Sequence, residues 1–294
     1  MQRNVQKLQL WTAGELALTG LLLALAAWMC RGPLLDITSA AFNHPHQTHI
    51  LLVLPAALLL LWLRRKRLKY LRFSPSLLGP AVILVGWLLV WVGHEIDFRA
   101  AYHSGGLLVM AGALLSVTGA SALRLFLPVF AVFVFAIPVP GGVRQQIAGP
   151  LQSIATGVTH FLLELVGSTA TREGNALLIE GQRVAAGEAM HGMRMIFALA
   201  LIAFTFVFAI PFRPASRIAM LAVSPAVAIL CNVIGLIPTS LLYGAGMSEA
   251  AETVYSIMQW AMLPIALLML IGLFRLMHWL ELPVTTWRLA GSAP

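Results

Sequence analysis

Cysteine and charge are the two features that this sequence has least of. It contains 2 cysteines, Cys30 and Cys231, which are too few for a disulfide framework or a cysteine-based metal site. Only 10% of its 294 residues are charged and 60% are hydrophobic, a composition that soluble domains of this size do not have. Internal repeats and low-complexity tracts are also absent. The sequence therefore excludes a disulfide-stapled scaffold and a soluble globular protein.

Acidic residues are scarcer than basic ones, and the formal net charge is +8. The basic residues occur in short loops between apolar runs rather than on one face, so they do not form a nucleic-acid footprint. The first apolar segment has no convincing small-residue cleavage site and more spans follow it, so we expect a retained helix. We expect the lipid bilayer as the main partner of this chain, and no nucleic acid.

Apolar runs long enough to cross a bilayer recur from end to end, and the mean hydropathy is +0.88. They predict a polytopic all-α membrane protein that forms one domain over residues 1–294. The boundary between the fourth and fifth helices is the least distinct, with a tight turn expected near Arg124. We predict about eight transmembrane helices, at 9–29, 48–63, 77–94, 105–121, 123–138, 191–211, 217–242 and 254–280.

Basic residues in the loops predict the orientation of the chain. Most of them fall on one side of the membrane if every span crosses, which places both termini in the cytoplasm of a bacterial inner membrane. We interpret the basic cluster after the second span as a topology anchor that touches anionic lipid. It consists of Arg64, Arg65, Lys66, Arg67, Lys69 and Arg72.

The segment 139–187 interrupts the pattern of spans. Residues 143–166 carry polar side chains among apolar positions at helical spacing, which predicts an amphipathic helix at the outer membrane interface. The alternation in Ala176–Glu180, the turn at Gly181-Gln182 and the run Arg183–Ala186 predict a small β-hairpin. Exposed backbone polar groups cannot lie in lipid, so we expect the hairpin to cap the bundle on the periplasmic side.

The most informative motif is Glu188-Ala189-Met190-His191-Gly192-Met193-Arg194, at the start of an apolar run. It resembles the Glu-Ala-Cys-Ser-Gly-x-Arg signature of the exosortase/archaeosortase family. Further resemblances occur in the same order as in the family, over roughly 200 residues, which makes a chance match improbable. They are His49, the apolar run before Pro138-Val139-Pro140, Pro150-Leu151-Gln152, Arg172-Glu173-Gly174-Asn175, Asn232 and Trp260.

The resemblance implies a membrane-embedded transpeptidase-like enzyme that cleaves a C-terminal sorting signal. The implied catalytic triad is a cysteine, an arginine in the seventh span and a histidine at the start of the eighth. Here Met190 stands at the cysteine position, Gly235 at the arginine position, and Tyr255, or Ser256 if the alignment slips by one, at the histidine position. A thioether carries no proton and cannot become the thiolate that an acyl-enzyme requires.

Retained architecture with a lost triad suggests a catalytically inactive protein. Our leading hypothesis is a binding or structural subunit, or an assembly factor of a membrane complex, that docks a partner transmembrane helix. Gly192 and Trp260 belong to the retained architecture. We expect Arg194 to pair with an acidic residue such as Glu188, and Asn232 to hydrogen-bond between helices.

Two alternatives remain open. The first is a divergent sorting peptidase or transpeptidase that uses His191 or Cys231, with Thr239 and Ser240 as further hydroxyls available in the seventh span. The second is a small-molecule, quinone or metal site in the cavity that the missing arginine and histidine would leave.

The side chains of Met190, His191, Met193 and Met195 are of types that suit copper(I). Their helical spacing places them on different faces of a helix, however, so they do not converge on one ion. We expect no metal and no cofactor at this place.

Overall fold

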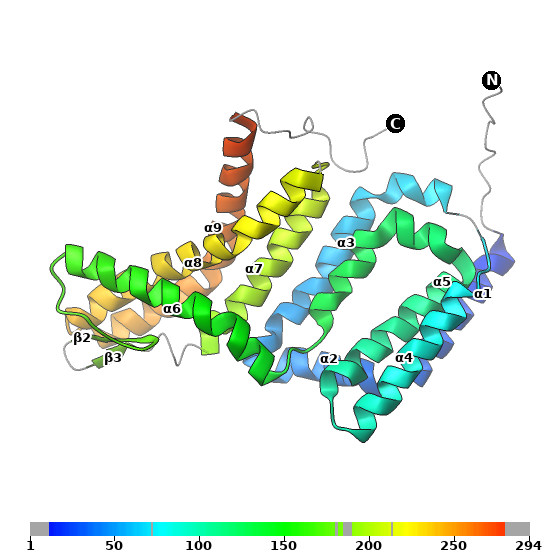
Figure 1. The fold of residues 1–294 in the computed structure, drawn as a ribbon, viewed down its shortest axis with the longest axis horizontal. Helices are drawn as coiled ribbons and strands as arrows, with labels where there is room; N and C mark the ends of the chain where they lie inside the picture. The colour runs from blue at the N-terminus through cyan, green and yellow to red at the C-terminus, as the bar shows by residue number, and fades with distance from the viewer. Residues whose placement is uncertain (1–11, 72, 180–181, 185–189, 213, 280–294) are drawn as a thin grey trace. The chain divides into compact units, whose positions relative to one another are not determined.

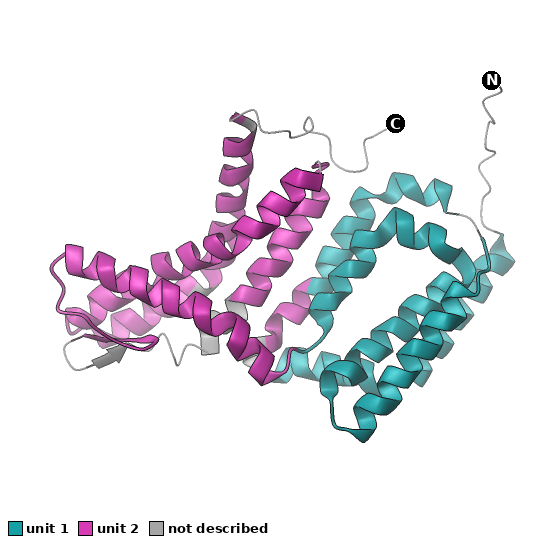
Figure 2. Ribbon diagram, in the orientation of Figure 1, with its two compact units in different colours: residues 1–44, 53–138, 287–294 teal, residues 45–52, 139–286 magenta. Residues whose placement is uncertain are grey.

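The structure is a computed structural model that describes residues 12–71, 73–179, 182–184, 190–212 and 214–279. The chain divides into two compact units, which Figure 2 shows in teal and magenta. Unit 1 consists of Met1–His44, Val53–Pro138 and Trp287–Pro294, and unit 2 consists of Pro45–Leu52 and Val139–Thr286. The expectation of one membrane domain stays a prediction, and the two units are described separately.

Helices are the regular secondary structure of unit 1 within its described residues (Figure 1). α4 and α5 pack along each other, and α1, α2 and α3 each contact α5. α5 is therefore the central element of this unit. The elements are α1 Ala13–Met29, α2 Arg31–Asn43, α3 Val53–Leu63, η2 Arg65–Tyr70, α4 Leu78–Glu95, α5 Arg99–Ala131 and η3 Val132–Ala136.

A capping box starts α1. The Thr12 hydroxyl accepts from the backbone N–H of Glu15, and the Glu15 carboxylate accepts from the backbone N–H of Thr12 at 2.7 Å. α1 ends at Cys30, and α2 leaves at a bend of 73°. Pro33 is tolerated in the first turn of α2, where a backbone N–H has no helical partner. The sequence analysis did not predict α2.

Glycines on one face of α4 set how closely it approaches α5. Gly79, Gly86 and Gly93 recur every seven residues and are buried. A Cβ at Gly79 would overlap the backbone of Ser116, and one at Gly86 would lie 2.8 Å from the Gly105 carbonyl oxygen. The two backbones therefore touch, as small residues allow between membrane helices.

α5 is broken at Gly119, where φ is +60°. An L side chain rarely adopts this conformation, so glycine is suited to the break. The segment before α4 crosses it: the Ser74 N–H donates to the Val117 carbonyl at 2.8 Å, and the Ser76 N–H donates to the Ser116 carbonyl. A second residue with non-helical dihedral angles, Phe126 (φ −121°, ψ 22°), lies two residues after Arg124. The tight turn predicted near Arg124 therefore falls between two breaks of α5, at Gly119 and at Phe126.

Unit 2 contains four long helices and a small sheet (Figure 1). α8 contacts α6, α7 and α9, and η1 contacts α7. The predicted amphipathic helix at 143–166 is confirmed as α6, whereas its position at the membrane interface stays a prediction. The elements are η1 Pro45–Leu52, α6 Gly141–Leu165, β1 Thr171–Glu173, β2 Ala176–Ile179, β3 Gln182–Val184, α7 Met190–Ala209, α8 Pro214–Gly244 and α9 Ser248–Trp279.

The predicted hairpin forms the second and third strands of a three-stranded antiparallel sheet with the order β1-β2-β3. Ile179 pairs with Gln182 and Leu177 with Val184, while the turn residues 180–181 lie outside the described residues. The sequence analysis missed β1. It joins β2 through a two-residue turn in which Gly174 has φ +63°, a conformation typical of hairpin loops that begin with glycine.

The spans are fewer than the eight predicted. By length and composition, 4 described helices can cross a membrane, or 5 if the bent pair α1–α2 counts as one span. The predicted fourth and fifth spans form one kinked helix over Arg99–Ala136. The second and sixth correspond to the shorter apolar helices Gln47–Leu63 and Ile196–Ala209. The chain is thus a multi-pass membrane protein, and the eight-span count is not confirmed.

Candidate functional site

The motif that dominates the sequence opens α7. Glu188 and Ala189 lie outside the described residues, and α7 begins at Met190. His191, Gly192 and Arg194 are in its first turns, and the side chains from 190 to 195 are also outside the described part. The ion pair expected for Arg194 therefore stays a prediction.

Short connections bring the three altered triad positions to one level. Only four residues separate α7 from α8, and three separate α8 from α9, so successive helices are antiparallel neighbours. α7 has 20 residues, and the twentieth residue of α8 is Val233, close to Gly235. Tyr255 is the eighth residue of α9, and the eighth residue from the end of α8 is Ile237. From these residue counts, we expect Met190, Gly235 and Tyr255 to lie within about one helical turn of one another along the bundle.

Gly235 is buried against α9. A Cβ at this position would overlap the terminal methyl carbon, Cε, of Met262, and would lie 3.8 Å from the Cβ of Met258. Met262 is itself only 4% exposed. The sequence analysis expected a gap where the family's arginine would lie. That expectation is wrong at Gly235, because the flexible Met262 side chain fills the space.

Cys231, one turn before Gly235, lies in the apolar core of unit 2. It is fully buried, and its thiol contacts the Met269 sulfur at 3.7 Å. Its neighbours come from all three helices. A nucleophile needs a path for its substrate, and Cys231 has apolar side chains around it. The core consists of Leu199, Ala203, Val207, Ile210, Phe212, Met220, Val227, Ala228, Cys231, Met262, Ala266, Leu270, Phe274 and Met277.

Three polar side chains of α8 flank Gly235. Asn232 is 8% exposed. Thr239 donates to the Gly235 carbonyl oxygen at 2.9 Å, which satisfies its hydroxyl within the helix. The Ser240 hydroxyl is buried and has no hydrogen-bond partner among the described residues. The interhelical hydrogen bond expected for Asn232 stays a prediction.

Trp260 is a large aromatic residue of the family pattern that lies at the surface. Its side chain belongs to α9 and is 77% exposed. Tryptophan buries a large area on contact and is enriched among residues that anchor interfaces. Trp260 is therefore available for contact with lipid or with another chain.

The Arg172-Glu173-Gly174-Asn175 motif attaches the sheet to α6. The Arg172 guanidinium donates to the Ser153 carbonyl at 3.0 Å, to the Ser153 hydroxyl at 2.8 Å and to the Gly174 carbonyl at 2.8 Å. The Asn175 amide donates to the Gly149 carbonyl. On the other side, Ile179 packs against Gly244 at the end of α8. The motif thus holds the sheet between α6 and α8.

His49 belongs to the same unit. Its ring is 4% exposed and stacks on Phe197 of α7, with ring centroids 5.5 Å apart. This contact joins η1 to the helix that carries the motif. The structure therefore gives His49 a packing contact in the apolar core.

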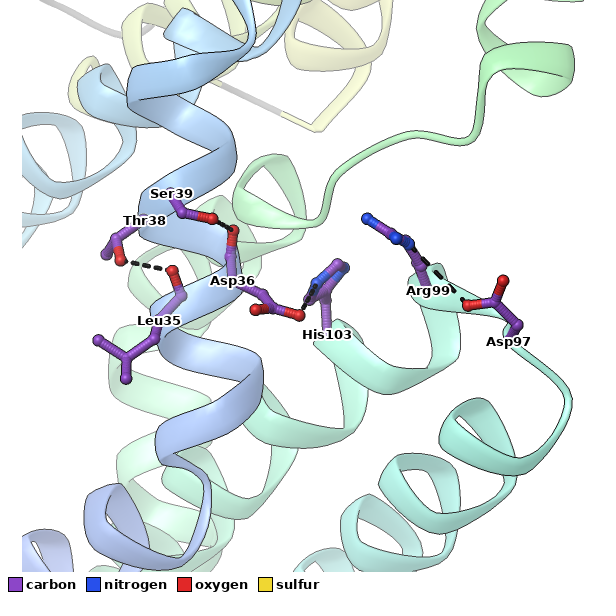
Figure 3. A network of polar contacts seen from close by, with 7 residues as sticks. All are labelled: Leu35, Asp36, Thr38, Ser39, Asp97, Arg99 and His103. Atoms are coloured by element: carbon purple, nitrogen blue, oxygen red, sulfur yellow. Dashed lines mark hydrogen bonds and ion pairs between the residues drawn. The ribbon is translucent and has the colours of Figure 1, made fainter.

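Sequence reasoning missed a second polar group, which lies in unit 1 (Figure 3). His103 of α5 is 3% exposed, and its Nε2 lies 3.9 Å from the Asp36 carboxylate of α2. Figure 3 shows the Asp36 carboxylate directed at the His103 ring, and Arg99 directed at Asp97 nearby. A histidine inside an apolar, glycine-rich helix was the available signal, because intramembrane ionisable residues need a partner.

No group of three His, Cys, Asp or Glu side chains within the described residues is close enough to hold a metal ion. The methionine and histidine side chains considered for copper(I) belong to residues 190–195 and lie outside the described part. The chemistry available at Gly235 is accordingly that of a packed, mainly apolar helix interface with a few hydroxyls.

Comparison with protein families gives one match. The model of the transmembrane exosortase family (Exosortase_EpsH) matches residues 38–272, which is most of the chain. Comparison with the curated proteins and with the solved structures gives no match.

Proposed function

Because the chain belongs to the transmembrane exosortase family, we propose that it acts as a non-catalytic member which binds a transmembrane helix of a partner protein. It would serve as a subunit or assembly factor of a membrane complex. We place both termini in the cytoplasm of the inner membrane and the altered site on the periplasmic side. Its partners are then the lipid bilayer and other membrane proteins.

The packing of Met262 against Gly235 is the observation that carries the proposal. A cysteine peptidase needs a cation or a hydrogen-bond donor beside the oxyanion of its tetrahedral intermediate. At Gly235 there is no side chain, and the Met262 methyl occupies the adjoining volume. An arginine would have to displace Met262 from a close-packed core. The packing of Met262 is therefore compatible with glycine at position 235 and not with arginine.

The cysteine position supports the same conclusion by chemistry alone. Met190 cannot lose a proton, so it supplies neither a thiolate nor an acyl-enzyme. The cysteine of α8, Cys231, is fully buried against Met269. A divergent peptidase that uses Cys231 would need to open the core of unit 2 in order to admit a peptide. A divergent peptidase that uses His191 remains the alternative function.

Retention of the surrounding architecture favours a binding role. Arg172 joins the sheet to α6 by two hydrogen bonds to Ser153, and His49 stacks on Phe197 of α7. These contacts shape the region around the altered site without contributing to chemistry. A protein that only had to span the bilayer would not need these contacts.

The test is native mass spectrometry of the protein purified from its own membrane in mild detergent. We expect a second membrane protein in fixed stoichiometry. Recovery of this chain alone, together with a truncated peptide, would contradict the proposal and favour the peptidase that uses His191. A processing assay with the H191A and C231A variants would then decide which residue acts.

Trp260 offers a sharper version of this test. Trp260 is 77% exposed and Trp279, at the end of the same helix, is 78% exposed. We expect W260A to lower partner recovery about tenfold or more, as loss of an interface anchor does. W279A serves as the matched control and should leave recovery unchanged. Equal recovery with both variants would place the partner elsewhere.

A further inference from the structure

The charged surface of unit 1 that the proposed function does not use is the short helix η2. Arg65, Lys66 and Lys69 are exposed there, directly after the apolar helix α3. We call these three side chains the basic patch. Arg67, between them, is partly buried and donates to the Leu125 carbonyl of α5 at 3.4 Å.

Intrachain acids do not neutralise the basic patch. The sequence contains no aspartate or glutamate between Asp36 and Glu95. Within the described residues, the patch makes no ion pair. Three cations within five residues repel one another, and they gain from an external anion.

Aromatic side chains accompany the cations. The Arg65 guanidinium lies over the Trp62 ring at 4.8 Å, and the Lys69 ammonium lies over the Tyr70 ring at 5.0 Å. Both rings are about half exposed, at 53% and 51%, and Leu68 between them is 45% exposed. Cations, tryptophan and tyrosine together at the end of an apolar helix are typical of the headgroup level of a bilayer.

The patch is held in a fixed position. The bond from Arg67 to Leu125 joins η2 to α5, and the Arg67 N–H donates to the Arg64 carbonyl at 2.7 Å. The cations are thus presented by a folded turn rather than by a loose loop. Preorganised charges lose less conformational entropy when they bind.

We propose that the basic patch is a binding site for anionic phospholipid headgroups. Arg65, Lys66 and Lys69 contact the phosphates, while Trp62, Tyr70 and Leu68 lie against the upper acyl chains. The mixture of exposed apolar and basic side chains favours a lipid over a nucleic acid, which has no acyl chain to cover Leu68 and Trp62. This site is independent of the partner helix proposed above.

The experiment is native mass spectrometry of the full chain, delipidated in mild detergent and titrated with phosphatidylglycerol or phosphatidylcholine. We expect tighter binding of phosphatidylglycerol, and weaker binding at higher salt. Neutralising two cations in R65Q/K69Q should weaken it about 30-fold. R65K/K69R, which keeps the charge, should bind as the unmodified protein does.

The matched control is R31Q/R99Q. Arg31 also lies over a tryptophan, Trp28, at 5.1 Å, but outside the basic patch, and Arg99 lies near Asp97. This variant loses the same charge and should bind phosphatidylglycerol nearly as well as the unmodified protein.

Three outcomes would overturn the proposal. They are equal weakening in the two double variants, equal affinity for the two lipids, and tighter binding of an oligonucleotide than of phosphatidylglycerol. If R65Q/K69Q does not fold, salt independence of lipid binding by the unmodified protein would overturn it as well.

Discussion

Glycine lies at a helix interface in both units, but it meets different atoms in each. On α4 of unit 1, a Cβ at Gly79 would meet the backbone of Ser116, which cannot move without moving α5. On α8 of unit 2, a Cβ at Gly235 would meet Cε of Met262, the free end of a flexible side chain. The first glycine is required by close helix contact. At the second glycine, the Met262 side chain occupies the volume that a side chain at position 235 would need.

The two units also differ in the kind of polar side chain that they bury. Unit 1 buries an ionisable side chain, His103, next to the Asp36 carboxylate. The buried polar side chains beside Gly235 are the uncharged Asn232, Thr239 and Ser240, and an apolar cluster of α7, α8 and α9 packs around Cys231. The polar groups near Gly235 are therefore amide and hydroxyl groups rather than charged ones.

The largest effect is expected at Gly79. The G79V substitution forces side-chain atoms into the Ser116 backbone, and should lower the free energy of unfolding by about 3 kcal/mol or more. Thermal unfolding in detergent measures it. G20V is the control, since a Cβ at Gly20 has nothing within 4 Å. Equal destabilisation by the two variants would show that helix propensity rather than helix contact is responsible.

The next effect tests Gly235 by a double-mutant cycle. G235L alone overpacks Met262, and M262A alone leaves a cavity that should cost about 2–3 kcal/mol. The M262A change makes room for the leucine, and the leucine fills the cavity. The loss of unfolding free energy in G235L/M262A should therefore be smaller than the sum of the losses in the two single variants, by about 1–2 kcal/mol. Additive free energies of unfolding would show that the two residues do not share one volume.

A smaller effect is expected at Arg172. R172A removes three hydrogen bonds of an exposed side chain, and should lower the free energy of unfolding by about 1.5 kcal/mol. It should also speed amide hydrogen exchange in residues 171–179, which hydrogen-exchange mass spectrometry measures. The neighbouring exposed residue supplies the control, E173Q. Unchanged exchange in R172A would show that the sheet is held by its apolar contacts alone.

The smallest effect is expected at Cys231. C231A removes one buried sulfur, an atom of about the size of a methylene, and should cost about 0.8 kcal/mol. Partner recovery and membrane processing should not change, because the thiol lies in the core. Loss of processing in a folded C231A protein would revive the peptidase hypothesis, and urea titration would establish that the protein is folded.

Sequence patterns predicted local elements better than their boundaries. The hairpin at β2–β3 followed from alternation and a turn signal, and α6 followed from helical periodicity. β1 was missed because three residues are too few to show alternation, although Gly174-Asn175 is a turn signal. The turn expected near Arg124 lies between the breaks of α5 at Gly119 and Phe126. The hydrogen bonds of Ser74 and Ser76 beside Gly119 were not predicted, because those residues come from a distant part of the chain.

The candidate site was predicted as a set of positions but not as an environment. Short connections make α7, α8 and α9 antiparallel neighbours, whereas the convergence of Met190, Gly235 and Tyr255 stays a prediction. What fills the space at Gly235 was not accessible, because Met262 is 27 residues away on another helix. His103 was missed for the same reason: its partner, Asp36, lies on a helix that hydropathy did not indicate.

The sequence by itself determined that this is a multi-pass membrane protein of the transmembrane exosortase family, and that Met190 cannot act as a nucleophile. Composition suffices for the membrane class, ordered motifs and the match over residues 38–272 for the family, and the chemistry of a thioether for Met190, because none of these depends on which residues are neighbours in space. Only the tertiary structure decided that Met262 packs against Gly235, that Cys231 is buried and that Arg172 anchors the sheet. Packing joins residues that are far apart in the chain, and such contacts leave no local pattern in the sequence.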